Sequence, residues 1–460
     1  MPTLDSTPIP GLLVVHLDVH GDDRGWFKEN WQRAKMIDLG LPDFGPVQNN
    51  VSYNSATGVT RGIHAEPWDK FVSVTTGRVF GAWVDLRAGA SFGFVYTHEI
   101  GPDTAVYVPR GVGNAYQVLE DDTAYTYLVN AHWRPEVTYT ELHLGDPAVA
   151  IPWPIPLSDP RIQTSAKDAS NPMLADVTPV AADPVLVIGA GGQVGRALLR
   201  EFPEAVGITR DELDIADPVS VARFDFSPYR AVINAAAYTA VDAAESPEGR
   251  SAAWAANASG PTSLAEAASR HGFILVHYSS DYVYDGEAAL HHEDEPMAPL
   301  GVYAQSKAAG DLAVSVTPRH YILRTSWVIG DGHNFVATMR RLARDGVSPA
   351  VVSDQVGRLT FTADLAAATR HLLETEAAYG IYHVSGSGQP GSWADIARAV
   401  FKATGRSARD VSDQSTADYA QGRQVAPRPA NSVLSLTRLE ATGFTMPDQW
   451  ASLAGYLDES

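Results

Sequence analysis

A glycine-rich turn near the middle of the chain constrains the fold more strongly than any other feature. The run PVLVIGAGGQVG at residues 184–195 has the pattern of a short buried strand that ends in glycines and leads into a helical segment, RALLREF. Gly189, Gly192 and Gly195 would leave backbone amides at a helix N-terminus open to a pyrophosphate. Further strand-like runs alternate with alanine-rich helical stretches downstream, at residues 230–233, 273–278 and 321–323. This rhythm predicts an α/β domain with a doubly wound parallel sheet that binds a dinucleotide.

The first third of the chain has a different character. Residues 11–155 are dense in short segments with strand chemistry, separated by Gly, Pro and Asp turns, which predicts an all-β barrel or sandwich. The pattern then fades into a run rich in Ala, Ser, Asp and Pro with no sustained period. A chain of 460 residues is longer than one hydrophobic core usually supports. We therefore expect a β domain over 1–165, a linker over 166–183 and an α/β domain over 184–460.

Composition narrows the chemistry. The formal charge of -20 opposes the backbone of nucleic acids and the surface of anionic membranes, so we expect neither as a partner. The chain has no cysteine, which leaves serine, tyrosine, histidine and carboxylates to carry any reaction. Its start lacks the basic and apolar regions of a signal peptide, and no apolar run is long enough to span a bilayer. These features predict a soluble, cytoplasmic protein.

Three residues of the α/β domain form a candidate proton-donor site. Tyr303 and Lys307 stand four apart in YAQSK, at the start of an expected helix, so phenol and ammonium share one face. The lysine favours the phenolate, and the tyrosine can then give a proton to a carbonyl oxygen while hydride arrives at carbon. Ser280 in SSDYVYDG supplies a second hydroxyl to the same oxygen. Together with the glycine turn, this set predicts a nicotinamide-dependent ketone reductase.

The β domain offers a base and two cations in TRGIHAEPWDK. His64, with Arg61 and Lys70 nearby, suits proton abstraction beside a ketone, because an enolate oxygen forms as the proton leaves. Asp146 could orient the imidazole, and Tyr127 could protonate the opposite face. A metal is not expected, since no second histidine follows His64 at ligand spacing.

The second half resembles the dTDP-4-dehydrorhamnose reductases, which are extended short-chain dehydrogenases with a Rossmann-type sheet and a small substrate-binding subdomain. The resemblance rests on GAGGQVG, INAAAYTAVDAAES, SSDYVYDG, YAQSK, RTSWVIG, SDQVGR and RPANSVL. It implies a catalytic triad of Ser280, Tyr303 and Lys307, and places Trp327 at the substrate. The residues expected at the cofactor, besides Tyr303 and Lys307, are Gly189, Gly192, Gln193, Val194, Gly195, Arg210, Asp214, Ala235, Ala236 and Tyr238.

The choice of cofactor depends on the end of the second strand. An acidic residue there usually binds the ribose hydroxyls of NAD, but this chain reads Ile-Thr-Arg-Asp at residues 208–211. Arg210 could instead favour a 2′-phosphate. We therefore expect NADPH, with NADH as the alternative.

The first half resembles the dTDP-4-dehydrorhamnose 3,5-epimerases, which are cupin-like jelly rolls that dimerise. The segments that carry this resemblance include DDRGWFKENW, QNNVSYNSATGVTRGIH, KFVSVTTGRVFGAWVDLR and VYVPRGVGNAYQVLEDD. It implies that His64 is the general base with Asp146 behind it, that Tyr127 is the acid, and that Lys70 helps to hold the enolate. It also implies a homodimer, and contacts to the nucleotide and its diphosphate from Arg24, Phe27, Glu29, Gln48 and Arg61.

The whole chain therefore reads as a fusion of two consecutive enzymes. The first half would epimerise C3 and C5 of dTDP-4-keto-6-deoxy-D-glucose, and the second would reduce the C4 ketone to give dTDP-L-rhamnose. Two alternatives stay open for the first half: a single-centre epimerase, or a catalytically silent module that binds the sugar nucleotide or dimerises. Asn114 stands where a histidine is usual in the epimerases, which leaves the number of centres epimerised open.

Overall fold

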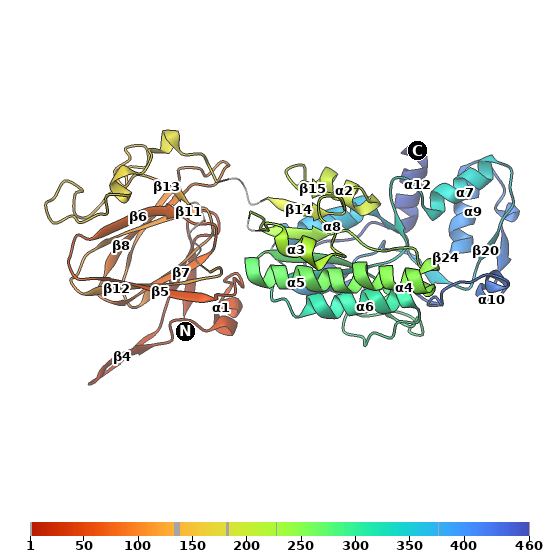
Figure 1. Ribbon diagram of the computed structural model, residues 1–460, viewed down its shortest axis with the longest axis horizontal. Helices are drawn as coiled ribbons and strands as arrows, with labels where there is room; N and C mark the ends of the chain where they lie inside the picture. Colours follow the sequence, from red (N-terminus) through yellow and green to blue (C-terminus); the bar gives the residue numbers. More distant parts are fainter. Residues whose placement is uncertain (1, 133–138, 181–183, 227, 376, 460) are drawn as a thin grey trace. The chain divides into compact units, whose positions relative to one another are not determined.

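The computed structural model describes residues 2–132, 139–180, 184–226, 228–375 and 377–459 (Figure 1). The chain divides into two compact units, residues 1–183 and 184–460, which we describe separately. Their boundary agrees with the start of the predicted α/β domain at residue 184. None of the helices in these described ranges combines the length and the apolar character needed to cross a lipid bilayer.

The first unit is built from two antiparallel sheets, as the strand pattern predicts. Val72, Trp83 and Val106 belong to a buried cluster to which both sheets contribute. The six-stranded sheet has the order β1 (Thr3–Ser6), β2 (Leu13–His16), β10 (Thr104–Val108), β7 (Lys70–Thr76), β12 (Thr123–Val129), β5 (Gln48–Asn54). The five-stranded sheet has the order β13 (Thr140–Glu141), β6 (Thr60–Ala65), β11 (Val112–Val118), β8 (Val79–Asp85), β9 (Val95–Ile100).

Two smaller elements of this unit lie outside the sheets. The helix α1 (Arg33–Leu39) begins with the side chain of Gln32 capping the amide of Lys35 and ends at Gly40 in the left-handed conformation. Within the part of the chain that the structure describes, the strands β3 (Val19–Asp22) and β4 (Gly25–Lys28) pair only with each other, in a hairpin that projects from the barrel in Figure 1.

The segment that follows the barrel strands is part of the first unit. It contains two short 3-10 turns, η1 (Asp168–Ser170) and η2 (Leu174–Asp176). The amide of Val180 donates to the carbonyl of Leu86 at 2.7 Å, and its carbonyl accepts from the amide of Ala88 at 2.7 Å. Leu174 and Val177 pack into the core beside the five-stranded sheet. The expectation of a linker over 166–183 is therefore wrong for residues 166–180. The segment lacks a hydrophobic period because it packs through isolated side chains rather than through a regular element.

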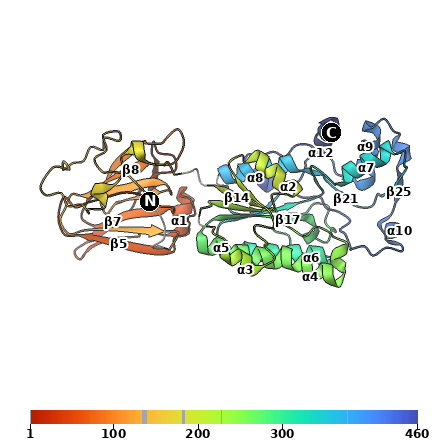
Figure 2. The same ribbon diagram turned by 45° about the horizontal axis from the view of Figure 1, so that its top comes forward.

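The second unit is a doubly wound α/β sheet, which confirms the predicted fold. Its six strands are all parallel, in the order β15 (Val206–Ile208), β14 (Val185–Ile188), β16 (Ala231–Asn234), β17 (Ile274–Ser280), β18 (His320–Thr325), β23 (Gly380–His383). One face packs against α2 (Gln193–Glu201) and α8 (Thr362–Glu374). The opposite face packs against α3 (Pro218–Arg223), α5 (Gly260–His271) and α6 (Val302–Ser315), with α4 (Pro247–Trp254) beside α6 (Figure 2).

A smaller subdomain is attached to this sheet. Ile329, Val336, Val400 and Leu453 belong to its own buried cluster. Its main elements are α7 (Phe335–Arg344), α9 (Trp393–Ala403), α12 (Gln449–Glu459) and the paired strands β20 (Ala350–Val352) and β25 (Ser412–Gln414). Because ligands of open α/β sheets bind beyond the carboxyl ends of the strands, this subdomain can supply one wall of a substrate site.

Candidate active sites

The first unit holds a polar cavity of about 630 Å³ between its two sheets. Strands from both sheets and the segment 163–168 form its walls. Side chains capable of proton transfer or charge stabilisation line it, namely Arg61, His64, Glu66, Lys70, Tyr127 and Asp168. The structure therefore brings together four of the predicted residues, His64, Lys70, Tyr127 and Arg61.

The partner of His64 is Asp168. The Nε2 atom of His64 lies 2.8 Å from Oδ1 of Asp168, which is 5 % exposed and sits in the turn η1. The second oxygen of Asp168 accepts the amide of Gly62 at 3.4 Å. Gly62 has a φ of 117°, and a Cβ there would lie 2.6 Å from the Cβ of Ala115. Only glycine allows the strand to pass so close while its amide helps to hold the carboxylate.

The prediction that Asp146 orients His64 is wrong. Asp146 is buried, but its Oδ1 accepts the amide of Ala148 at 2.7 Å and its Oδ2 accepts the amide of Leu174. It therefore ties the segment after the barrel to the loop before it. The sequence pattern favours Asp146 as the carboxylate beside His64, and it assigns Asp168 to the expected linker. Nothing in the local pattern around Asp168 marks it, because 104 residues separate it from His64.

Lys70 and Tyr127 lie side by side in the cavity. The Nζ atom of Lys70 is 5.7 Å from the centre of the Tyr127 ring, and it forms an ion pair with Glu66. Burial lowers the pKa of Lys70 to about 7. Burial, with the phenols of Tyr116 and Tyr139, raises the pKa of Tyr127, so the phenol keeps its proton at neutral pH and can act as an acid.

Four of the five predicted nucleotide contacts, Arg24, Phe27, Glu29 and Gln48, do not line this cavity. Arg24 and Phe27 sit on the β3–β4 hairpin, where the Arg24 side chain is 89 % exposed and Phe27 is 69 % exposed. Glu29 pairs with Lys35 at 2.8 Å, and Gln48 donates to Asn50 at 2.9 Å. Arg61 alone of the five lines the cavity, where its Nε donates to Asn54 at 3.1 Å.

The glycine turn of the second unit has the geometry of a dinucleotide cradle. Gly189 follows β14 with a φ of 82°, and a Cβ on it would lie 2.8 Å from the amide of Ala236. A Cβ on Gly195 would lie 2.2 Å from the carbonyl oxygen of Gly189, so the third glycine lets α2 approach the strand. Gly192 is the N-cap of α2 and has no side chain to cover the helix amides. The backbone therefore leaves the room that a pyrophosphate needs.

A second cavity, of about 230 Å³, continues from this turn. Five of the predicted cofactor residues line it: Gly189, Arg210, Asp214, Ala236 and Tyr238. Arg210 is 80 % exposed and pairs with Asp214 at 3.0 Å. Of the remaining predictions, Gln193 and Val194 lie in the first turn of α2, with Gln193 donating to the carbonyl of His333 at 2.9 Å, and Ala235 follows β16.

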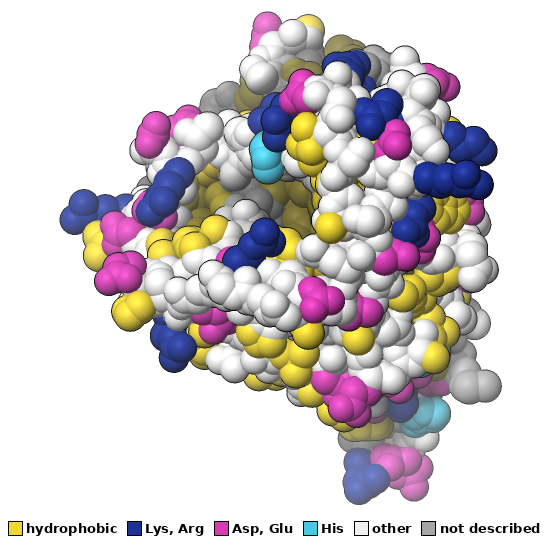
Figure 3. Space-filling model, turned by 90° about the vertical axis from the view of Figure 1, so that its right-hand side faces the viewer, with side chains coloured by type: hydrophobic (Ala, Val, Ile, Leu, Met, Phe, Trp, Pro, Cys, Tyr) yellow, Lys and Arg dark blue, Asp and Glu magenta, His cyan; other side chains and the backbone are white. Residues whose placement is uncertain are grey.

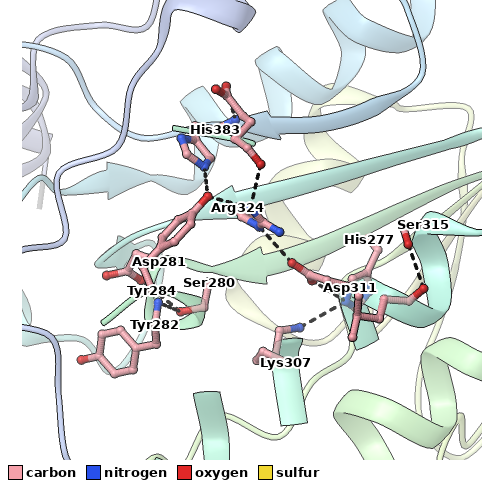
Figure 4. A network of polar contacts seen from close by, with 12 residues as sticks. His277, Ser280, Asp281, Tyr282, Tyr284, Lys307, Asp311, Ser315, Arg324 and His383 are labelled. Carbon is pink, nitrogen blue, oxygen red and sulfur yellow. Dashed lines mark hydrogen bonds and ion pairs between the residues drawn. The ribbon is translucent and has the colours of Figure 1, made fainter. Parts of the chain in front are cut away.

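Ser280 ends β17, and Tyr303 and Lys307 lie on α6, which packs against that strand. Ser280 and Lys307 are labelled in Figure 4, and the Ser280 hydroxyl is within hydrogen-bonding reach of Tyr303. Lys307 is 2 % exposed, and its Nζ donates to the carbonyl of Tyr278 in that strand at 2.5 Å. Burial lowers the pKa of Lys307 to about 8, against the pull of Asp311. Burial and the carboxyl of Asp281 raise the pKa of Tyr303 to about 12, while the Ser280 hydroxyl lowers it. The phenol is therefore a proton donor at neutral pH.

A buried polar network lies behind Lys307 (Figure 4). The imidazole of His277 is 3.5 Å from the Lys307 Nζ, and Asp311 accepts from Arg324 at 3.0 Å. Arg324 donates to the hydroxyl of Tyr284 at 2.6 Å, and Tyr284 is hydrogen-bonded in turn to the imidazole of His383 at 2.7 Å. Asp311 stands four residues after Lys307 on α6, so helical spacing could have found it from the sequence. The rest of the network joins three strands and needs the fold.

Trp327 follows β18 with a φ of 44°, which is rare for a tryptophan. Its ring stacks on Trp393 at 3.7 Å between centroids, where α9 begins. Figure 3 shows a hollow on the face turned to the viewer, with hydrophobic side chains inside it. A pair of stacked indoles like Trp327 and Trp393 offers an aromatic surface on which a planar group can pack.

Two family models match the chain. Residues 6–176 match the model described as dTDP-4-dehydrorhamnose 3,5-epimerase, and residues 183–460 match the RmlD substrate binding domain. A Streptococcus pyogenes protein named RmlC homolog is 45% identical over 37% of this chain and 89% of its own. The dTDP-4-dehydrorhamnose reductase of Aggregatibacter actinomycetemcomitans is 39% identical over 58% of this chain and 95% of its own. The crystal structure of the Bacillus anthracis dTDP-4-dehydrorhamnose reductase in complex with NADP is 32% identical, with a TM-score of 0.56, over 60% of this chain and 99% of its own.

Proposed function

Because the chain belongs to the dTDP-4-dehydrorhamnose 3,5-epimerase family over residues 6–176 and to the dTDP-4-dehydrorhamnose reductase family over residues 183–460, we propose that it carries out both reactions in sequence. The substrate is dTDP-4-keto-6-deoxy-D-glucose, and the product is dTDP-L-rhamnose. The observation that carries the proposal is the presence of two separate proton-transfer sites, one in each unit.

In the first site His64 removes the proton from the carbon beside the ketone. Donation of its Nε2 proton to Asp168 at 2.8 Å leaves Nδ1 as the basic nitrogen, and the carboxylate stabilises the imidazolium that forms. Lys70 is buried and stabilises the negative charge that develops on the enolate oxygen. Tyr127 returns a proton to the carbon with the opposite stereochemistry. The cavity of about 630 Å³ is large enough for a sugar and part of its nucleotide.

In the second site Tyr303 gives its proton to the C4 oxygen. The bound nicotinamide coenzyme supplies the hydride to C4. Lys307 stabilises the phenolate that Tyr303 becomes, and Ser280 donates a hydrogen bond to the same oxygen. Epimerisation has to come first, because reduction removes the ketone that makes the neighbouring C–H bonds acidic.

Product analysis tests the whole proposal. The chain is mixed with dTDP-4-keto-6-deoxy-D-glucose and NADPH in deuterated water, and the product is examined by NMR. We expect dTDP-L-rhamnose with deuterium at C3 and C5. A 6-deoxyhexose with deuterium at one centre would make the first unit a single-centre epimerase. Reduction without deuterium would make it a silent module, and no reduction would refute the assignment of the second unit.

NADPH is the proposed cofactor, since Arg210 lines the cavity beyond the glycine turn and a relative's structure contains NADP. Arg210→Ala should lower the ratio of kcat/KM for NADPH to that for NADH by roughly tenfold or more, the value of a lost charged hydrogen bond. Asp214→Asn is the matched variant, because it releases Arg210 from its carboxylate and should raise the same ratio. An unchanged ratio in Arg210→Ala would assign the phosphate to other residues.

We place both reactions in the cytoplasm, where NADPH is available; recovery of the activity in a washed membrane fraction would contradict this.

The first unit also carries the features of a homodimer. A two-stranded hairpin is marginal by itself in water, yet β3 and β4 pair with no other strand among the described residues. The edge strand β5 presents Val51 and Tyr53 to solvent, at 66 % and 61 % exposure. We infer that a second copy covers this edge and that each hairpin delivers Arg24 and Phe27 to the cavity of its partner.

Complementation between variants tests this arrangement. His64→Ala and Arg24→Ala chains are each expected to lose most deuterium exchange. When the two are mixed, unfolded and refolded together, half of the dimers are mixed, and each mixed dimer has one intact site. About a quarter of the wild-type exchange should therefore return. A mixture that stays as inactive as its components, or a monomer in sedimentation, would show that Arg24 does not cross between chains.

A further inference from the structure

Asp281, the residue after Ser280, lies buried against the hydroxyl of Ser280. It opens the 3-10 turn η5 (Asp281–Val283) and is 3 % exposed. Its Oδ1 accepts the Ser280 hydroxyl at 3.0 Å, and the Ser280 oxygen accepts the amide of Tyr282 at 3.2 Å (Figure 4). The single proton of the Ser280 hydroxyl is therefore directed at Asp281 and not at the site of the ketone.

An ionised Asp281 conflicts with the role of Ser280. If Ser280 turns its proton to the ketone, Oδ1 of a buried carboxylate loses its donor, which is costly. Oδ2 is buried and has no hydrogen bond of good geometry among the described residues, although the Ser432 hydroxyl is close enough to favour the charged form. A protonated Asp281 resolves the conflict. It donates to the second lone pair of the Ser280 oxygen, and Ser280 then donates to the ketone.

The charge of Asp281 also opposes the step at Tyr303. A carboxylate here raises the pKa of Tyr303, yet Tyr303 must become a phenolate as it gives up its proton. A neutral Asp281 removes this repulsion. Around it, the titratable and charged groups are Tyr303 on α6, His291 and the neighbouring Tyr282, which Arg428 faces. Burial outweighs the pull of His291, Ser280 and Ser432 and raises the pKa of Asp281 to about 6.

We propose that Asp281 is a positioning residue of the ketoreductase, which must be protonated so that Ser280 can donate its hydrogen bond to the ketone oxygen. The proposal rests on the reductase activity proposed above. The protonated form of Asp281 is lost as pH rises through its pKa, so the rate of reduction falls on the alkaline side. Bound substrate excludes more water from Asp281. The alkaline limb, meaning the part of the pH profile in which the rate falls, therefore has its midpoint at or above the pKa of Asp281 in the free protein, about 6.

The test is the pH profile of kcat for NADPH oxidation by the full chain, from about pH 5.5 to 8.5. The ketone is supplied from dTDP-4-keto-6-deoxy-D-glucose by an excess of the Tyr303→Phe chain, which keeps its epimerase site. In wild type, kcat should fall by about tenfold per pH unit beyond the limb. Asp281→Asn carries an amide that donates permanently to Ser280. It should stay within about threefold of the wild-type maximum and lose the limb.

Two further variants complete the design. Asp281→Ala cannot donate and should lose about tenfold or more in kcat at every pH. Asp364→Asn is the matched control, because Asp364 is also a carboxyl whose pKa burial raises, but it accepts a hydrogen bond from Ser452 at 3.3 Å rather than from Ser280 and should leave the profile unchanged. NADPH binding, followed by fluorescence, checks that each variant is folded.

The outcomes separate the two proposals. A wild-type chain that never reduces the ketone refutes the proposed function. A wild-type profile that is flat over this range overturns the role of Asp281 without any variant. So does an Asp281→Asn chain that binds NADPH and keeps the limb unchanged, or that binds NADPH and is inactive at every pH.

Discussion

Tyr303→Phe should lower the rate of ketone reduction by roughly a thousandfold, because it removes the only group placed to give a full proton to the C4 oxygen among the described residues. Deuterium exchange at C3 and C5 should stay at the wild-type rate, since that chemistry belongs to the cavity of the other unit. The change deletes one hydroxyl and keeps the ring, so the packing of Tyr303 against Tyr282 is preserved. NADPH oxidation and NMR-detected exchange, measured on the same preparation, give the two rates.

The mirror variant is the control for this prediction. His64→Ala should abolish exchange, and it should still reduce dTDP-4-keto-L-rhamnose when that ketone is supplied directly. If Tyr303→Phe and His64→Ala each lose both activities, the two sites are not independent and the assignment of one reaction to each unit fails.

Asp168→Asn should slow deuterium exchange by about a hundredfold or more. The carboxylate at 2.8 Å both orients the imidazole of His64 and stabilises its charged form, and an amide can do neither fully. The effect should appear in kcat rather than in KM, because Asp168 contacts the base His64 and is not expected to contact the nucleotide. Exchange into dTDP-4-keto-6-deoxy-D-glucose in deuterated water, with NADPH omitted, measures it directly.

Asp146→Asn is the matched control on the same unit. It weakens the hydrogen bonds to the amides of Ala148 and Leu174, and should reduce the stability of the first unit by about 1–3 kcal/mol. Its exchange rate per folded molecule should remain close to wild type. A variant pair with the opposite behaviour, in which Asp146→Asn is the inactive one, would restore Asp146 as the partner of His64.

Fusion of the two units has a simple chemical consequence. The intermediate that leaves the first site is the substrate of the second, and one chain supplies both catalysts in equal number. The sequence of reactions is set by the ketone, which activates C3 and C5 and is consumed last. A chain that reduced before it epimerised would release a sugar of the wrong configuration. The two sites therefore need not communicate for the order to be kept.

Local features determined most of the second unit from sequence alone. A Cβ on Gly189 would meet the backbone just after β16, and a Cβ on Gly192 or Gly195 would meet the carbonyl oxygen of Gly189 in the same turn. Tyr303 and Lys307 are four residues apart on one helix, so their common face follows from helical geometry. In the first unit, the strand pattern predicted the all-β fold, and His64 and Tyr127, which the sequence predicts as base and acid, both line the cavity.

The tertiary structure decided the partners of these groups. Asp168 contacts His64 from a segment whose sequence has no periodic pattern. Single contacts, such as the hydrogen bond from the Gly62 amide, hold this segment in place, and such contacts leave no period in the sequence. Its neighbours in sequence look like a linker, and only burial against the barrel distinguishes it from one. Asp281 is adjacent to Ser280 in sequence, but its raised pKa follows from burial, which depends on elements far along the chain. The sequence thus predicted the groups that we propose do the chemistry, and the fold decided which carboxylates lie beside them, since burial and long-range contact leave no local signal.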